Sequence, residues 1–242
     1  YRVYSQDNIL CCIVKKEATG FMLPEGSTTF LCPQAAPMGG FARTSPSYET
    51  SYTVDDVTGK NGWGNGYTFP CLFKNEDKGW ILISETGVSS AYCGSRLLGK
   101  ENGLYTIGFP QEGEYNGNGT VSPGIALPGE TPWRTITVGK TLAPIVETTV
   151  MFDVVKPLYE ASQDFQYGCG TWSWIIGGDN SMNYDEQKRY IDFSADMGYS
   201  SVLVDALWDT QVGRDKIAEL ADYAASKGVA LYLWYNSNGY WN

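Results

Sequence analysis

Aromatic and polar side chains gather at the ends of three short apolar runs in the last third of the sequence. The runs are Gly170 to Ile176, Ser201 to Val204 and Val229 to Tyr235, and the residues are Trp172, Trp174, Asp205, Trp208, Trp234 and Asn236. An indole offers an apolar platform for the C–H face of a sugar ring, and a carboxylate or amide accepts hydrogen bonds from its hydroxyls. The set therefore favours a sugar-binding site. Each residue alone could as well belong to a core, and Asp205 could cap a helix or pair with a basic neighbour.

Two amphipathic segments separate these apolar runs. The first starts at Asn183 with Glu186 three residues later, as in a capping box, and ends at Gly198. Its expected buried face carries Tyr190, Phe193, Ser194 and Met197. The second ends at Lys227-Gly228, and its expected buried face carries Ile217, Leu220, Ala221 and Ala224.

The order strand–helix–strand–helix–strand predicts right-handed crossovers and a parallel sheet. Three parallel strands leave apolar faces and an edge uncovered, so they do not make a whole domain. We therefore expect residues 169–242 to be the first part of a (β/α)₈ barrel, truncated after its third strand, with its chemistry at the carboxyl-terminal strand ends.

Residues 1–150 have a different pattern, in which apolar and polar residues alternate over short runs broken by Gly, Pro and Asn. This pattern predicts an antiparallel β-sandwich, followed by a linker at 151–168. The expected strands are Arg2 to Val14, Thr28 to Cys32, Tyr67 to Phe73, Trp80 to Ser84, Tyr105 to Phe109, Trp133 to Val138 and Ile145 to Met151.

Composition excludes several kinds of chemistry and partner. The formal net charge of -10 disfavours nucleic acid and anionic membrane surfaces, and no apolar stretch reaches the length of a membrane span. The lack of histidine excludes Ser-His-Asp and Cys-His catalytic groups, so acid–base chemistry must use other groups such as carboxylates, and a metal would be held by oxygen donors.

The adjacent Cys11 and Cys12 would point to opposite faces of a strand, and we expect them to be separate core residues.

Several strings resemble glycoside hydrolase family 97, the calcium-dependent α-glucosidases and α-galactosidases. They are Trp80–Glu85, Thr131–Arg134 with the strand Thr135–Val138, Gly170–Trp174, Tyr190–Tyr199, Val204–Trp208, Lys227–Val229 and Leu233–Asn236. The fifth string is similar to the family's D-x-G-W turn, with Leu207 in place of glycine. The resemblance covers roughly residues 45 to 242, and residues 1 to 44 are placed by continuity.

This resemblance implies a galactose-mutarotase-like super-sandwich followed by a (β/α)₈ TIM barrel. It also implies calcium-dependent hydrolysis of α-linked glucose or galactose, with galactose slightly favoured, an oligosaccharide or glycoside substrate, and a periplasmic or secreted location. The catalytic carboxylates of the family would lie beyond residue 242, so we expect this fragment alone to be inactive. One calcium ligand would be a glutamate of the sandwich: Glu49 first, within the Ser47–Tyr52 segment, and Glu85 second. Either glutamate could instead be a solvated surface residue.

Two other classes of protein remain possible from the sequence. A non-catalytic carbohydrate-binding β module would explain residues 1–150 but not the strand–helix alternation after them. A barrel enzyme of small-molecule metabolism would carry Gly-rich phosphate-binding loops late in the barrel.

Overall fold

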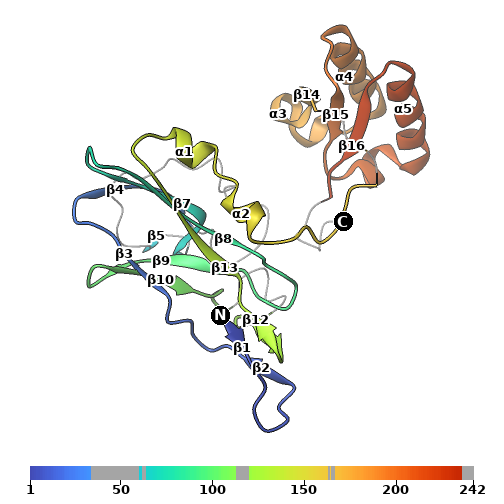
Figure 1. Ribbon diagram of the computed structural model, residues 1–242. Coiled ribbons are helices and arrows are strands. Elements are labelled where there is room, and N and C mark those ends of the chain that lie inside the picture. Colours follow the sequence, from blue (N-terminus) through green and yellow to red (C-terminus); the bar gives the residue numbers. More distant parts are fainter. Residues whose placement is uncertain (34–59, 62–63, 113–119, 163, 165–166, 236–242) are drawn as a thin grey trace. The chain divides into compact units, whose positions relative to one another are not determined.

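The computed structural model describes residues 1–33, 60–61, 64–112, 120–162, 164 and 167–235 (Figure 1). The chain divides into two compact units, Tyr1–Tyr159 and Glu160–Asn242. This division falls within the segment 151–168 that the sequence predicts as a linker. Each unit is described by itself below.

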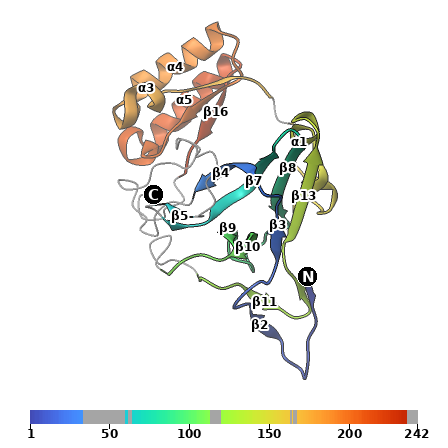
Figure 2. The ribbon, with the colours of Figure 1, turned by 90° about the vertical axis from the view of Figure 1, so that its left-hand side faces the viewer.

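The first unit is built on a seven-stranded antiparallel sheet in the order β13-β8-β7-β9-β10-β3, with β4 also paired to β7. Figure 2 shows β7, β8 and β13 running side by side. The strands are β3 (Gly20–Met22), β4 (Ser27–Pro33), β7 (Tyr67–Asn75), β8 (Gly79–Thr86), β9 (Arg96–Glu101), β10 (Leu104–Gly108) and β13 (Trp133–Gly139). Three two-stranded pairs accompany this sheet: β1 (Arg2–Val3) with β12 (Gly129–Glu130), β2 (Cys11–Ile13) with β11 (Gly124–Ala126), and β5 (Lys60–Asn61) with β6 (Gly64–Asn65). The predicted antiparallel β architecture is confirmed.

The core of this unit follows from the two-residue period of its strands. Tyr67, Cys71 and Phe73 point to the same face of β7 and are buried, and Tyr105 of β10 meets Phe73 edge-on at 5.2 Å between ring centroids. The buried cluster comprises Phe21, Leu31, Tyr67, Cys71, Phe73, Ile83, Leu97, Tyr105 and Ile107.

The register of β13 on β8 brings distant charged residues together. The pairing runs from Trp133 opposite Thr86 to Gly139 opposite Trp80, which places Arg134 directly opposite Glu85. A Cβ on Gly79 would lie 2.6 Å from the carbonyl oxygen of Gly139, so this close approach requires glycine at position 79.

Three expectations for this unit are wrong. The predicted strand Ile145 to Met151 is replaced by two single-turn helices, α1 (Ala143–Val146) and α2 (Val150–Asp153). This stretch has no regular apolar–polar alternation, and Pro144 suits the first turn of a helix. The predicted strand Arg2 to Val14 is split into β1 and β2, because Asp7 and Asn8 take left-handed turn conformations.

The third error concerns the cysteines at the start of the chain. Cys11 is exposed and Cys12 is only half-buried, so neither is a core residue. Both lie on β2, which within the described ranges pairs only with the short β11, so no large described sheet buries it.

The second unit contains a three-stranded parallel sheet in the order β14-β15-β16, formed by Gly170–Trp172, Ser201–Val204 and Ala230–Leu233. The connections hold α3 (Trp174–Gly177), a 3₁₀ turn η4 (Gly178–Ser181), α4 (Tyr184–Asp196), a π-turn η5 (Trp208–Val212) and α5 (Arg214–Ser226). The two long helices α4 and α5 pack on each other and on this sheet (Figure 1). The predicted parallel arrangement is confirmed, and it is the arrangement with which a (β/α)₈ barrel begins.

The ends of the helices agree with the prediction from the sequence, whereas the buried face of α4 agrees only in part. Asn183 Oδ1 accepts the backbone N–H of Glu186 at 3.0 Å, and Gly228 follows α5 with φ +74°. In α5 the predicted Ile217, Leu220 and Ala224 are buried. In α4 the predicted Ser194 is buried, but its buried companions are Gln187 and Ile191, while the predicted Phe193 and Met197 are 49% and 53% exposed.

The two outer strands also differ from expectation. The first apolar run is a strand only as far as Trp172, because α3 begins at Trp174. The strand β16 is half-exposed rather than buried, since among the described residues it has a neighbouring strand on one side only.

Candidate functional site

Parallel pairing brings the aromatic residues to one edge of the three-stranded sheet. Trp172 is the last residue of β14, Asp205 follows β15 directly, and Trp234 follows β16. The rings of Trp172 and Trp174 are stacked, with centroids 5.6 Å apart and an interplanar angle of 18°. The ring of Trp234 meets that of Trp172 edge-on at 6.1 Å and 84°. Trp172 is therefore the centre of a three-indole group, defined here as the aromatic platform: Trp172, Trp174 and Trp234.

Asp205 contacts this platform and not open solvent. Only 2% of the residue is exposed. Its Oδ2 accepts the indole N–H of Trp172 at 2.6 Å, and its Oδ1 accepts the backbone N–H of Ala206 at 2.6 Å. Burial raises the pKa of the Asp205 carboxyl above its ordinary value, against the lowering effect of these two hydrogen bonds. In the described part of the chain, the Asp205 carboxylate is thus enclosed by protein groups and is not open to solvent.

Trp208 belongs to the core rather than to the platform. It is buried among Val204, Ile217 and their neighbours, and its indole N–H donates to the carbonyl oxygen of Trp234 at 3.3 Å. The turn before it has Leu207 at φ +72°, a left-handed conformation that suits the glycine of the family's D-x-G-W turn. The last predicted member, Asn236, lies outside the described residues.

A buried polar network holds the junction between β14, which ends at Trp172, and α3, which begins at Trp174. The sequence analysis did not identify this network. Gln187 of α4 donates from Nε2 to Ser173 Oγ at 2.9 Å and to the carbonyl oxygen of Ser181 at 2.7 Å. Ser173 Oγ in turn donates to Ser181 Oγ at 2.9 Å. Gln187 lies one helical turn before the apolar Ile191 and therefore on the same buried face of α4. A polar residue in such a position was the sequence signal that could have indicated this network.

The first unit contains a second polar cluster, buried around Arg134. Its Nη1 lies 2.7 Å from Glu85 Oε2, and its Nη2 donates to Glu17 Oε2 at 2.9 Å. The three side chains are 7%, 9% and 4% exposed for Arg134, Glu85 and Glu17. Two carboxylates thus flank one guanidinium in a part of the fold from which water is largely excluded.

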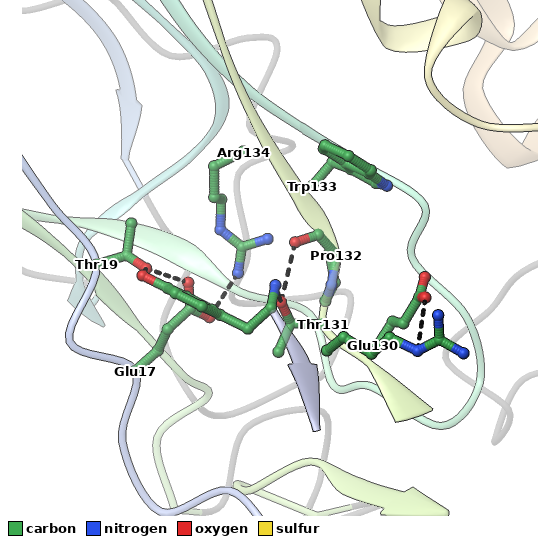
Figure 3. Close-up of a pocket in the computed structure, with 9 residues that line it drawn as sticks. Glu17, Thr19, Glu130, Thr131, Pro132, Trp133 and Arg134 are labelled. Carbon is green, nitrogen blue, oxygen red and sulfur yellow. Dashed lines mark hydrogen bonds and ion pairs between the residues drawn. The ribbon is translucent and has the colours of Figure 1, made fainter. Parts of the chain in front are cut away.

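Hydroxyl groups complete this cluster. Glu17 accepts from Thr19 at 2.7 Å and from the Tyr92 hydroxyl at 2.9 Å, and Ser95 donates to Glu85. Burial is the largest cause of the raised pKa of Glu85, and burial together with the bond to Glu17 raises the pKa of Tyr92. Figure 3 shows Glu17 and Arg134 at one side of a pocket of about 400 Å³ that is also lined by Thr19, Thr131, Pro132 and Trp133.

Glu85, the second candidate ligand, does not make a calcium site with the residues described. Calcium takes six to eight oxygen ligands. Within the described part of the chain no group of three or more Asp, Glu, Cys or His side chains could hold a metal ion, and Glu85 is turned to Arg134. Glu49 lies outside the described residues. The described residues therefore do not by themselves fit the calcium ion that the resemblance implies.

The family of the chain follows from both units. Residues 1–157 match the family described as "Glycosyl-hydrolase 97 N-terminal", and residues 164–242 match "Glycoside hydrolase 97". The chain belongs to glycoside hydrolase family 97.

Two curated relatives are similar to it. A "Probable retaining alpha-galactosidase" of Streptomyces bingchenggensis is 29% identical in an alignment 234 positions long, which covers 90% of this chain and 33% of that protein. A "Retaining alpha-galactosidase" of Bacteroides thetaiotaomicron is 28% identical in an alignment 126 positions long, which covers 44% of this chain and 19% of that protein. The chain thus spans about a third or less of the length of these relatives.

Two solved structures are also similar. A beta-arabinopyranosidase superposes with a TM-score of 0.87 at 56% identity, covering 100% of this chain and 39% of that one. A single-residue variant of a family 97 enzyme from a Pseudoalteromonas species superposes with a TM-score of 0.64 at 22% identity, covering 96% and 37%. In the described part of this chain, no helix combines the length and the apolar character that crossing a membrane requires.

Proposed function

We propose that the protein to which this chain belongs is a glycosidase acting on α-linked galactose or glucose, with galactose favoured. The observation that carries the proposal is the aromatic platform, at the sheet edge where barrel enzymes bind their substrates. Membership of family 97 and the two relatives named as retaining α-galactosidases support it.

The part played by this chain is to bind and orient the sugar. Indole faces stack on the C–H face of a pyranose ring and exclude water from it. Retaining hydrolysis needs two carboxyl groups about 5–5.5 Å apart, and inverting hydrolysis needs roughly 6.5–9.5 Å. Asp205 is buried, with both carboxylate oxygens hydrogen-bonded, so we do not assign it to the bond-breaking pair, which the family resemblance implies lies outside this chain. Calcium, which we still expect the whole enzyme to need, would likewise require ligands from outside the described residues.

A second candidate substrate is a β-arabinopyranoside. It is favoured by the 56% identity with a solved beta-arabinopyranosidase over the whole of this chain. L-Arabinopyranose has the ring hydroxyl configuration of D-galactopyranose and lacks the hydroxymethyl group. Stacking on an indole face uses the ring and not that group, so one platform suits both sugars.

The test measures turnover by the full-length protein, once with calcium and once with a chelator. The substrates are three p-nitrophenyl glycosides: the α-galactoside, the α-glucoside and the β-L-arabinopyranoside. We expect turnover of the galactoside or the arabinopyranoside, loss of turnover with the chelator, and no turnover by residues 1–242 alone. Binding of the sugars without hydrolysis of any of the three would instead identify a carbohydrate-binding module. Fractionation of the source cells tests the proposed periplasmic or secreted location.

A further inference from the structure

We propose that Asp205 is a positioning residue: it sets the orientation of the Trp172 ring in the aromatic platform and does not itself contact the sugar. The inference rests on the proposed function. It differs from the sequence-based expectation, in which Asp205 accepted hydrogen bonds from sugar hydroxyls.

The first argument is that Asp205 offers no acceptor to a ligand. Its two oxygens each accept a hydrogen bond at 2.6 Å, one from the Trp172 indole and one from the backbone of Ala206. With 2% of the residue exposed, the described part of the chain also covers the remaining lone pairs of these oxygens, so a sugar hydroxyl does not reach them.

The second argument is that this hydrogen bond defines where the Trp172 ring faces. An indole has a single N–H donor, and fixing that group leaves the ring little freedom about its side-chain torsions. Three neighbours therefore hold the Trp172 ring. Asp205 binds its N–H group, Trp174 stacks on it at an interplanar angle of 18°, and Trp234 meets it edge-on at 84°. A platform held in this way loses little conformational freedom when it binds a ligand.

The third argument concerns the carboxylate as the acceptor. A hydrogen bond to an ionised group is roughly twice as strong as one between neutral groups, and burial away from water strengthens it further. The bond from Ala206 holds the other oxygen, which prevents the carboxylate from turning away from Trp172.

The experiment is a double-mutant cycle in the full-length protein, with Asp205→Ala, Trp172→Phe and the double variant. Trp172→Phe keeps an aromatic ring and removes the N–H donor. We expect Asp205→Ala to raise KM about tenfold with little change in kcat, and to cause no further loss in the Trp172→Phe background. Multiplicative losses in the double variant would overturn the proposal, because they would mean that Asp205 acts independently of the indole.

Two further variants separate positioning from loss of folding. Asp205→Asn keeps a neutral acceptor, and we expect it to recover part of the KM. Asp209→Ala is the matched control, since the exposed Asp209 also accepts the N–H of the next residue, at 3.0 Å, but no indole N–H. We expect Asp209→Ala to leave KM unchanged. An equal rise in KM for Asp209→Ala would overturn the proposal.

A spectroscopic measurement tests the positioning without turnover. We expect the stacked pair Trp172–Trp174 to contribute an exciton couplet to the far-ultraviolet circular dichroism, which its loss in Trp172→Phe would identify. We expect Asp205→Ala to lose the same signal while Asp209→Ala retains it, and an unchanged signal in Asp205→Ala would count against the positioning role. If the wild-type protein hydrolyses none of the glycosides, the proposed function fails, and the circular dichroism still decides the role of Asp205.

Discussion

Replacing Arg134 by Met should destabilise the first unit far more than the loss of an ordinary ion pair. Arg134 pairs with both Glu17 and Glu85. Because these side chains are 4–9% exposed, the change leaves two carboxylates in a site with little water. Breaking a buried pair by removing one partner costs roughly 3–5 kcal/mol. For a unit of this size, about 2–4 °C per kcal/mol gives a fall in Tm on the order of 6–20 °C.

The matched control is Arg2→Met. Arg2 lies 3.8 Å from Glu130, and both side chains are more than half exposed, at 60% and 62%. Exposed pairs of this kind contribute about 0–1 kcal/mol. Calorimetry of the full-length protein and the two variants measures the difference. A shift for Arg134→Met no larger than that for Arg2→Met would refute the reasoning, because it would mean that the buried carboxylates find other partners or water.

The same variant has a defined dependence on pH. Burial already raises the pKa of Glu85 in the folded protein, and removing the guanidinium takes away an influence that lowers it. When the pKa of a carboxyl group is higher in the folded than in the unfolded protein, the free energy of unfolding falls as pH rises from the unfolded to the folded pKa. The deficit of Arg134→Met should therefore be larger at pH 8 than at pH 5. A deficit that grew on acidification would contradict this account.

Three further predictions concern the second unit, each read as the change in its unfolding transition by calorimetry of the full-length protein. Leu220→Ala empties a fully buried position of α5 and should cost roughly 2–5 kcal/mol, whereas a loss below 1 kcal/mol would mean that the helix is not packed there. Asn183→Ala removes the side chain that caps α4 and should cost about 1 kcal/mol, with Asn183→Ser recovering most of it. Gly228→Ala should cost about 1–2 kcal/mol through its φ of +74° alone, because a Cβ there meets nothing within 4 Å. Gly94→Ala is its control: Gly94 is equally unobstructed and has no positive φ, but it lies in the first unit, so its effect is read from the transition of that unit and should be smaller.

Local elements were predictable where their cause lies within a few residues. The cap at Asn183 and the end of α5 at Gly228 depend on backbone groups three to five residues away, and both agree with the sequence. Strands such as β15 agree because a short, uniformly apolar run has few alternatives once it lies between two helices. The stretch at 145–151 failed because an apolar composition without alternation does not distinguish a strand from short helical turns.

The buried face of α4 shows a different kind of error. The helical period predicted Ser194 correctly, but it also pointed to Phe193 and Met197, whereas Gln187 is buried in their place. Polar residues can be buried there because each has a partner, Ser173 for Gln187 and Thr171 for Ser194. Those partners come from another element, so the sequence of the helix does not reveal them.

The sequence by itself determined the change from antiparallel to parallel β structure, the family, and the arrival of Trp172, Asp205 and Trp234 at one edge of a sheet. All three depend on the order and period of the elements. Only the tertiary structure decided that Asp205 is buried against the indole of Trp172, that Trp208 packs into the core, and that Arg134 lies between two glutamates. The reason is that Arg134 is 117 residues from Glu17 in the chain, and such contacts depend on strand register and on which side chains compete for the same buried space.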